Sequence, residues 1–145
     1  MNKVYITWNQ VNKLLDKIHE QAQDIDYVAG IPRGGVILAI LYSHRFGVKY
    51  MEYPSNHYPH LLILDDIADS GETLKQWKDK LNVPLYGTLH YKRSSSVKPD
   101  FYGRKMIKED KIPVNKNLLI LYVEQEIENT DKTPLQILVE SNGIY

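Results

Sequence analysis

The segment 61–73 constrains the fold of this chain more than any other. It reads Leu-Leu-Ile-Leu-Asp-Asp-Ile-Ala-Asp-Ser-Gly-Glu-Thr, so four apolar residues run directly into two adjacent acids. Four consecutive apolar residues are typical of a buried strand in a parallel sheet. The carboxylates of Asp65 and Asp66 are then expected at the carboxyl end of that strand, where open α/β sheets bind ligands.

A short polar turn follows these acids and leads into an apolar helical pattern. Ser70 and Thr73 flank Gly71, which suits a helix start whose free N–H groups can hold a phosphate. Acids that can bind hydroxyl groups or a metal thus stand beside a cradle for phosphate, which indicates a sugar-phosphate site. The alternative is a strand that ends in a solvated acidic turn before a capped helix. It explains each residue singly but not their order.

The length and composition are those of one ordinary globular domain. The chain has 145 residues, of which 43% are hydrophobic and 25% are charged. Lys plus Arg and Asp plus Glu number 18 each, so the overall charge does not indicate nucleic-acid binding. No apolar stretch reaches the roughly 20 residues that span a membrane, and the N-terminus lacks the apolar region of a signal peptide. The absence of cysteine excludes disulfides and thiolate zinc sites and fits a cytoplasmic protein.

Strand and helix patterns alternate along the first two thirds of the chain. Helical patterns cover residues 8–23, 36–41 and the segment in which Leu74, Trp77 and Leu81 share a face. Strand patterns are found at 27–29, 48–53, 60–65, 83–91 and 101–107. This alternation predicts an α/β fold with a Rossmann-like parallel sheet, flanked by helices and joined by right-handed crossovers. Weaker patterns follow at 118–123, 124–133 and 135–139.

A second motif, Gly-Ile-Pro-Arg-Gly-Gly at residues 30–35, lies between the first of these strands and its helix. Glycines let a backbone approach a ligand closely, and the N–H groups of the helix start favour an anion. Arg33 would add a charge-assisted contact to that anion. A tight strand–helix turn would explain the glycines alone about as well.

Together, the two motifs resemble those of type I phosphoribosyltransferases. The segment 61–73 is similar to their phosphoribosyl-diphosphate motif, which consists of a hydrophobic strand, two acids, two variable residues and acid-Thr/Ser-Gly-x-Thr. The loop 30–35 resembles the Ser-Arg-Gly-Gly loop of xanthine-guanine phosphoribosyltransferases, which holds diphosphate. The resemblance implies one domain of the type I phosphoribosyltransferase fold, with a core over about 1–110 and a small C-terminal hood over about 111–145. It also implies a cis peptide bond between Pro32 and Arg33.

The resemblance implies roles for residues that bind the sugar phosphate. Asp65 and Asp66 would bind the ribose hydroxyl groups, directly or through Mg²⁺ and its water molecules. Arg33 and Gly34 belong to the loop that holds the diphosphate. The 5′-phosphate would be bound mainly by backbone N–H groups of four consecutive residues, Ser70, Gly71, Glu72 and Thr73. Glu72 is unusual there, since its carboxylate would repel the phosphate unless it turns away.

Three further residues would handle the base. By resemblance Asp69 is the general base at the purine N7, Lys92 donates to the purine O6, and Tyr122 stacks on the ring. Each has a plainer alternative: Asp69 as a helix cap, Lys92 as a solvated loop residue and Tyr122 as a buried strand residue. The Pro-Trp-Asp that follows in xanthine-guanine enzymes is replaced by Glu-Ile-Glu, which leaves the choice of base open.

The activity implied is transfer of a 5-phosphoribosyl group from phosphoribosyl diphosphate to guanine, xanthine or hypoxanthine in purine salvage. Small-molecule substrates, Mg²⁺ and a homodimer or homotetramer are expected, and neither nucleic acid nor a membrane is expected as a partner. The segment 54–60 departs from the family, because related enzymes carry a long mobile loop there that closes over the site. One alternative is therefore a weak or inactive regulatory module that binds phosphoribosyl diphosphate or a nucleotide. Another is an unrelated flavodoxin-like phosphate binder, or a hydrolase using the same acidic turn.

Overall fold

The computed structural model describes residues 4–107 and 111–115. The chain divides into two compact units, one formed by residues 9–110 and the other by residues 1–8 with 111–145. Within the second unit, two short strands, β1 (Val4–Ile6) and β7 (Pro113–Asn115), pair in parallel. Tyr122 and the patterns at 118–123, 124–133 and 135–139 lie outside the described residues.

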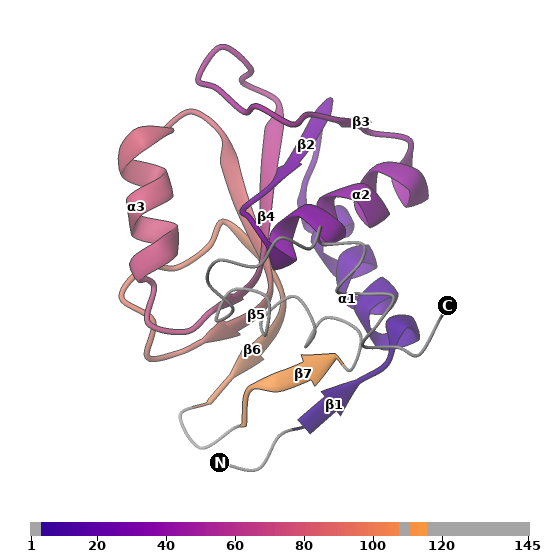
Figure 1. The fold of residues 1–145 in the computed structure, drawn as a ribbon, viewed down its shortest axis with the longest axis vertical. Helices are drawn as coiled ribbons and strands as arrows, with labels where there is room; N and C mark the ends of the chain where they lie inside the picture. The colour runs from indigo at the N-terminus through magenta and orange to yellow at the C-terminus, as the bar shows by residue number, and fades with distance from the viewer. Residues whose placement is uncertain (1–3, 108–110, 116–145) are drawn as a thin grey trace, which may run out of the picture. The chain divides into compact units, whose positions relative to one another are not determined.

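A five-stranded parallel sheet forms the centre of the unit 9–110, with strand order β3-β2-β4-β5-β6 (Figure 1). The strands are β2 (Tyr27–Gly30), β3 (Lys49–Tyr50), β4 (Leu61–Ala68), β5 (Leu85–Lys92) and β6 (Phe101–Met106). The helices of the described residues are α1 (Trp8–Gln21), α2 (Gly34–Phe46) and α3 (Glu72–Lys80). In Figure 1, α3 lies on one side of the sheet and α1 and α2 lie on the other. The predicted parallel sheet flanked by helices is confirmed.

The strand β4 runs further than the predicted 60–65. It continues to Ala68 because β5 offers partners beyond the apolar run, pairing Asp65 with Thr88 and Ile67 with His90. The acids therefore lie inside the second half of a strand and not in a turn after it. By contrast, β3 has two residues where 48–53 had been predicted.

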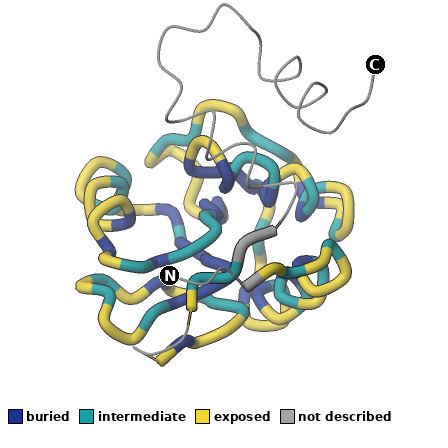
Figure 2. Tube along the Cα trace, turned by 60° about the horizontal axis from the view of Figure 1, so that its bottom comes forward, coloured by how far each residue is buried: buried dark blue, intermediate teal, exposed yellow. Residues whose placement is uncertain are grey.

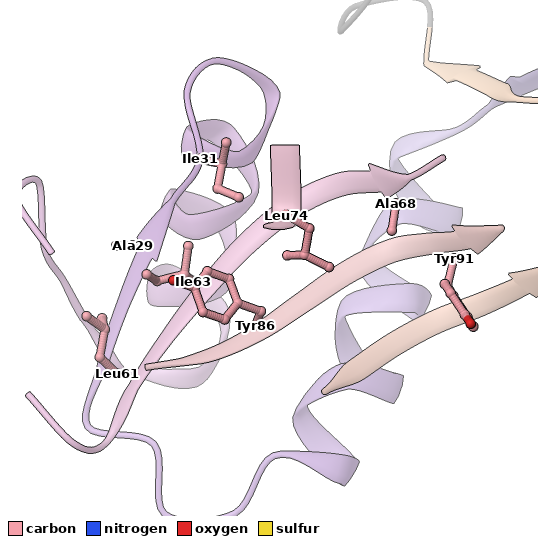
Figure 3. Close-up of a cluster of buried hydrophobic side chains, with 8 residues drawn as sticks. All are labelled: Ala29, Ile31, Leu61, Ile63, Ala68, Leu74, Tyr86 and Tyr91. Carbon is pink, nitrogen blue, oxygen red and sulfur yellow. The ribbon is translucent and has the colours of Figure 1, made fainter. Parts of the chain in front are cut away.

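The apolar core packs on both faces of the sheet. Helix α1 packs inward with Val11, Leu15 and Ile18, which are fully buried. A cluster on β2, β4, β5 and α3 is shown in Figure 3 and consists of Ala29, Ile31, Leu61, Ile63, Ala68, Leu74, Tyr86 and Tyr91. Buried residues follow the strands and inner helix turns, whereas loops and outer turns are exposed (Figure 2).

The helix α2 is buried on one side and exposed on another. Leu38, Ala39 and Tyr42 are buried, but Ile40 is 41% exposed. The reason is that α2 packs on β2 and β4 with one face only. Gly47 ends the helix as expected, with a left-handed φ of 67°.

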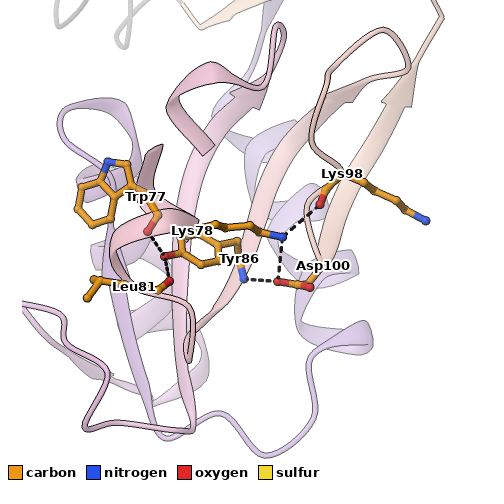
Figure 4. A network of polar contacts seen from close by, with 6 residues as sticks. All are labelled: Trp77, Lys78, Leu81, Tyr86, Lys98 and Asp100. Carbon is orange, nitrogen blue, oxygen red and sulfur yellow. Dashed lines mark hydrogen bonds and ion pairs between the residues drawn. The ribbon is translucent and has the colours of Figure 1, made fainter. Parts of the chain in front are cut away.

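A polar network ties the end of α3 to the sheet (Figure 4). The Tyr86 hydroxyl lies 2.6 Å from the Leu81 carbonyl oxygen and 3.1 Å from that of Trp77, so its one proton is within reach of both. The Trp77 carbonyl also accepts from the Leu81 N–H, whereas Leu81, at the C-cap of α3, has a carbonyl that the helix itself does not use. Asp100 accepts from the Tyr86 N–H at 2.8 Å and lies 3.7 Å from the Lys78 ammonium. These contacts fix the β5–β6 connection against α3.

The order of the strands reverses between β2 and β4. From β2 the chain passes through α2 to β3 on one side, and from β4 it passes through α3 to β5 on the other. The two strands are paired up to Gly30 and Leu64, and the Ile31 N–H donates to the Leu64 carbonyl at 2.8 Å. Both predicted motifs therefore leave the sheet side by side at a topological switch point, which is where open α/β sheets bind ligands.

Glycines allow the start of α2 to lie against these strands. A Cβ atom at Gly35 would overlap the Leu64 carbonyl oxygen, and one at Gly30 would overlap the Gly35 carbonyl oxygen. Both glycines thus permit close contact between protein backbones, in addition to any contact with a ligand.

We expect Gly35→Ala to lower the free energy of unfolding by about 2 kcal/mol or more, because backbone atoms must shift. Gly47→Ala is the matched control, since a Cβ there meets nothing within 4 Å and only the left-handed φ is strained. It should cost about 1 kcal/mol. Urea denaturation of both variants checks this, and equal losses would contradict the packing role of Gly35.

A second prediction concerns His90, which is 4% exposed and has no hydrogen-bond partner for either ring nitrogen within the described residues. Burial, with a smaller effect of Arg104, lowers the pKa of His90 to about 4. A lowered folded-state pKa means that protonation favours unfolding, so stability should fall between about pH 6.5 and pH 4. We expect the His90 contribution to approach about 1.4 kcal/mol per pH unit.

The measurement is the difference in unfolding free energy between the wild type and His90→Leu at several pH values. This difference should change with the stated slope, because other groups titrate equally in both proteins. His57→Leu, at an exposed position, is the control and should show no such slope. A flat difference for His90→Leu would overturn the prediction.

Candidate functional site

Two adjacent carboxylates lie in the second half of β4. Asp65 and Asp66 are both partly buried, and each accepts a hydrogen bond from the next N–H, that of Asp66 and that of Ile67, at 2.9 Å. Burial raises the pKa of Asp65 well above its ordinary value, and the charge of Asp66 adds to this rise. Burial also raises the pKa of Asp66, although hydrogen bonds partly offset it. Ionisation of both carboxyl groups without a bound cation therefore costs free energy. A cation beside the pair would lower that cost.

The turn after β4 leaves backbone donors free. Gly71 has a left-handed φ of 86° and occupies the N-cap position of α3, with no side-chain capping hydrogen bond. Ser70 accepts weakly from the Glu72 N–H at 3.3 Å, whereas the N–H groups of Gly71 and Thr73 have no partner within the described residues. Free N–H groups at a helix start form an anion-binding site.

The carboxylate of Asp69 does not cap α3 and instead contacts Lys92. The Lys92 Nζ lies 3.2 Å from Asp69 Oδ1, with side-chain exposures of 18% and 46%. Lys92 is the last residue of β5, so it lies at the carboxyl ends of the strands, as do the acids of the parallel strand β4. The structure thus brings together the two residues that the sequence predicted to act on one base, and neither of their plainer alternatives holds.

Glu72 turns away from the free donors. Its carboxylate accepts from the Gln76 side chain at 3.5 Å, one turn further along α3. The unusual acid in the motif therefore need not oppose an anion at Gly71 and Thr73. It also lies in the first turn of α3, where the helix dipole favours a negative charge.

The loop between β2 and α2 has the expected cis peptide bond between Pro32 and Arg33. Gly34 and Gly35 are buried, while Arg33 is exposed at the N-cap of α2. The exposed Arg33 side chain is thus available to an anion at the switch point, in a loop whose Gly35 lies against the backbone of Leu64 and Asp65.

The segment 54–60 is anchored at the amino ends of the strands, opposite the ends where the acids lie. The Asn56 side chain accepts from the Val83 N–H at 3.1 Å, and the His60 carbonyl accepts from the N–H groups of Asp26 and Tyr27. These partners precede β5 and begin β2, at the amino ends of the strands. The anchored part of this segment is therefore remote from the acids. Among the described residues, no group of three or more His, Cys, Asp or Glu could hold a metal ion.

Sequence reasoning missed one group of residues next to the turn. Ser95 and Ser96, in the polar connection from β5 to β6, lie against Gly71. Their sequence gives no sign of this contact, because it depends on how β5 lies beside β4.

No helix among the described residues is long and apolar enough to cross a membrane.

Comparison with solved structures places this arrangement in a known class. The purine phosphoribosyltransferase from Pyrococcus horikoshii is 26% identical with a TM-score of 0.61, over 79% of this chain and 93% of that one. The Helicobacter pylori xanthine-guanine-hypoxanthine phosphoribosyltransferase is 17% identical with a TM-score of 0.58, over 86% and 97% of the two chains. A Neisseria gonorrhoeae protein with bound ppGpp is 17% identical with a TM-score of 0.56, over 79% and 88%.

No protein-family model and no curated protein matches the chain. The fold and the two motifs at its switch point nevertheless resemble those of the type I phosphoribosyltransferases.

The acid pair should make the free protein less stable at neutral pH. A raised folded-state pKa contributes stability that is present below the unfolded pKa near 3.8 and is lost as pH rises. We therefore expect Asp65→Asn and Asp66→Asn to raise the melting temperature at pH 7 by a few degrees. The amide oxygen of Asn can still accept the backbone hydrogen bond.

Differential scanning calorimetry at pH 7 and pH 3.5 tests this expectation. The gain should shrink at pH 3.5, where the wild-type carboxyls are protonated. Asp79→Asn, at an exposed position on α3, is the control. A lower melting temperature for both site variants at pH 7 would contradict the assigned cost of the pair.

Proposed function

We propose that this protein transfers a 5-phosphoribosyl group from phosphoribosyl diphosphate to N9 of a 6-oxopurine, guanine, xanthine or hypoxanthine. The observation that carries the proposal is the 3.2 Å contact between Asp69 and Lys92, beside the acid pair and the free N–H groups. It supplies one acceptor and one donor at the place where a base would meet the sugar phosphate.

The Asp69–Lys92 pair matches one edge of a 6-oxopurine. On this edge O6 accepts a hydrogen bond, and the neighbouring N7 carries a proton in the tautomer whose N9 is free to attack. Lys92 would donate to O6 while Asp69 accepts from N7–H, so each keeps a hydrogen-bond partner when the base enters between them. A 6-amino group would instead place a donor against the Lys92 ammonium, which favours 6-oxopurines.

The sugar phosphate would occupy the carboxyl ends of β2 and β4. The 5′-phosphate would bind the N–H groups from Gly71 to Thr73 with the Ser70 hydroxyl, and the diphosphate would lie at Arg33 and Gly34. Asp65 and Asp66 would hold the ribose hydroxyl groups and Mg²⁺. The donor set fits Mg²⁺, which favours one or two carboxylates together with substrate oxygens and water. When bound, the ion would neutralise part of the charge that develops on the diphosphate.

In the reaction, N9 attacks C1 of the ribose while the bond from C1 to the diphosphate oxygen breaks. The N7 proton passes to the Asp69 carboxylate, and the electron pair of the broken bond leaves with the diphosphate. Positive charge on the sugar ring and negative charge on the leaving group develop together. Positioning by Lys92 and the N–H cradle holds the reacting atoms in line.

A second candidate is a regulatory module that binds the nucleotide or phosphoribosyl diphosphate without turnover. The observation in its favour is the anchoring of the segment 54–60 away from the site, which leaves no long loop there to exclude water. The hood over 111–145, the stacking role of Tyr122 and a dimer or tetramer remain predictions, and they would supply cover in an active enzyme.

The test is nucleotide formation by purified protein with Mg²⁺, phosphoribosyl diphosphate and each of guanine, xanthine, hypoxanthine and adenine. At least one 6-oxopurine should be converted and adenine should not. Binding of guanosine monophosphate without any turnover would favour the regulatory module. Absence of both binding and turnover with every base would overturn the proposal.

Two variants separate the roles at the base. Asp69→Asn should lower kcat by about a hundredfold or more while the affinity for phosphoribosyl diphosphate is kept, since a general base contributes on that scale. Lys92→Met should mainly raise KM for the 6-oxopurine. Asp79→Asn and Lys75→Met, at exposed positions on α3, are the matched controls and should behave as wild type. A kcat of Asp69→Asn equal to that of Asp79→Asn would remove Asp69 from the reaction.

A further inference from the structure

The connection from β5 to β6 packs directly on the turn that follows β4. We call residues 93–97, Arg-Ser-Ser-Ser-Val, the serine loop. A Cβ atom at Gly71 would lie 2.6 Å from Ser95 Oγ and 2.7 Å from Ser96 Oγ. Gly71 is thus required both by its left-handed φ and by the serine loop that covers it.

The serine loop holds one particular peptide group. The Ser70 carbonyl oxygen accepts hydrogen bonds from both the N–H and the hydroxyl of Ser96, each at 2.9 Å. Two donors use both lone pairs of this oxygen, so its direction is fixed. Because the C=O and N–H of a trans peptide point in opposite directions, the Gly71 N–H is directed away from the serine loop.

The loop itself is folded by hydrogen bonds that begin at Lys92. The Ser95 N–H donates to the Lys92 carbonyl at 2.9 Å, and the Ser95 hydroxyl donates to the Val97 carbonyl at 2.7 Å. Ser96 is therefore presented to Ser70 by a turn that starts at the residue paired with Asp69. One short loop links the residue proposed to read the base with the turn proposed to hold the phosphate.

We propose that Ser96 is a positioning residue for the 5′-phosphate. It fixes the Ser70–Gly71 peptide so that the Gly71 N–H, which has no partner within the described residues, is aimed at the anion. This inference rests on the proposed function, because it takes the 69–73 turn as the phosphate subsite. It extends that function to a residue outside the motif. Preorganised N–H groups bind an anion better because they need no reorientation.

The size of the effect follows from what Ser96→Ala removes. The backbone N–H of residue 96 still donates to Ser70, so only one of the two hydrogen bonds is lost. We expect affinity for a 5′-phosphorylated ligand to fall about fivefold to tenfold. Ser96→Thr keeps the hydroxyl and should restore wild-type binding. Ser94→Ala, at an exposed position of the same loop, is the matched control.

The test is calorimetric titration of wild type and the three variants with guanosine 5′-monophosphate and with guanosine, both with Mg²⁺. Ser96→Ala should weaken binding of the monophosphate and leave guanosine binding unchanged. The ¹⁵N–¹H signal of Gly71 should shift on addition of the monophosphate, and less so in Ser96→Ala. A role in folding alone would change binding of both ligands together.

The outcomes separate this inference from the proposed function. If wild type binds the monophosphate and Ser96→Ala binds it equally well, the positioning role is overturned and the proposed function stands. If Ser96→Ala weakens the two ligands alike, or Ser94→Ala matches it, the positioning role is overturned as well. If wild type binds neither the monophosphate nor phosphoribosyl diphosphate, the proposed function fails and the inference fails with it.

Discussion

The pairing of β2 with β4 is the constraint on which the candidate site depends. These strands carry the two motifs, and their register brings Gly30 level with Leu64. The start of α2 can approach them because Gly35 has no side chain to overlap the Leu64 carbonyl. The Gly-rich loop 30–35 therefore leaves the sheet beside the acids of β4, although the two motifs are well separated in the sequence.

Electrostatics at this switch point favour ligand binding over stability of the free chain. Two desolvated carboxylates lie side by side in a strand, and free N–H groups lie at the start of α3. Each feature is unfavourable without a partner, since buried charge and unpaired donors both cost free energy. A sugar phosphate with a divalent cation supplies the missing partners together. Such local conflicts with stability are expected at functional sites.

Much of this arrangement could be predicted from sequence because it follows from local patterns. The apolar run before Asp65 predicted a central parallel strand, and the order of strands and helices predicted the sheet. The family resemblance implied that Asp69 and Lys92 both contact the purine base, and in the structure their side chains are in contact with each other. The extension of β4 to Ala68 was missed, because acids have low strand propensity and the ladder with β5 overrides it. Hydropathy alone does not show which apolar residues of α2 stay exposed, because it does not reveal how many neighbours a helix has.

The contact of Ser96 with Ser70 could not be predicted, because it joins residues 26 positions apart and its acceptor is a backbone carbonyl, which carries no sequence signal. The most direct test of the account is a crystal structure with guanosine monophosphate and Mg²⁺. The account predicts the phosphate on the N–H groups of residues 71–73, the ribose beside Asp65 and Asp66, and the N7–O6 edge between Asp69 and Lys92. A nucleotide bound away from the carboxyl ends of β2 and β4, with Asp69 still paired to Lys92, would contradict it.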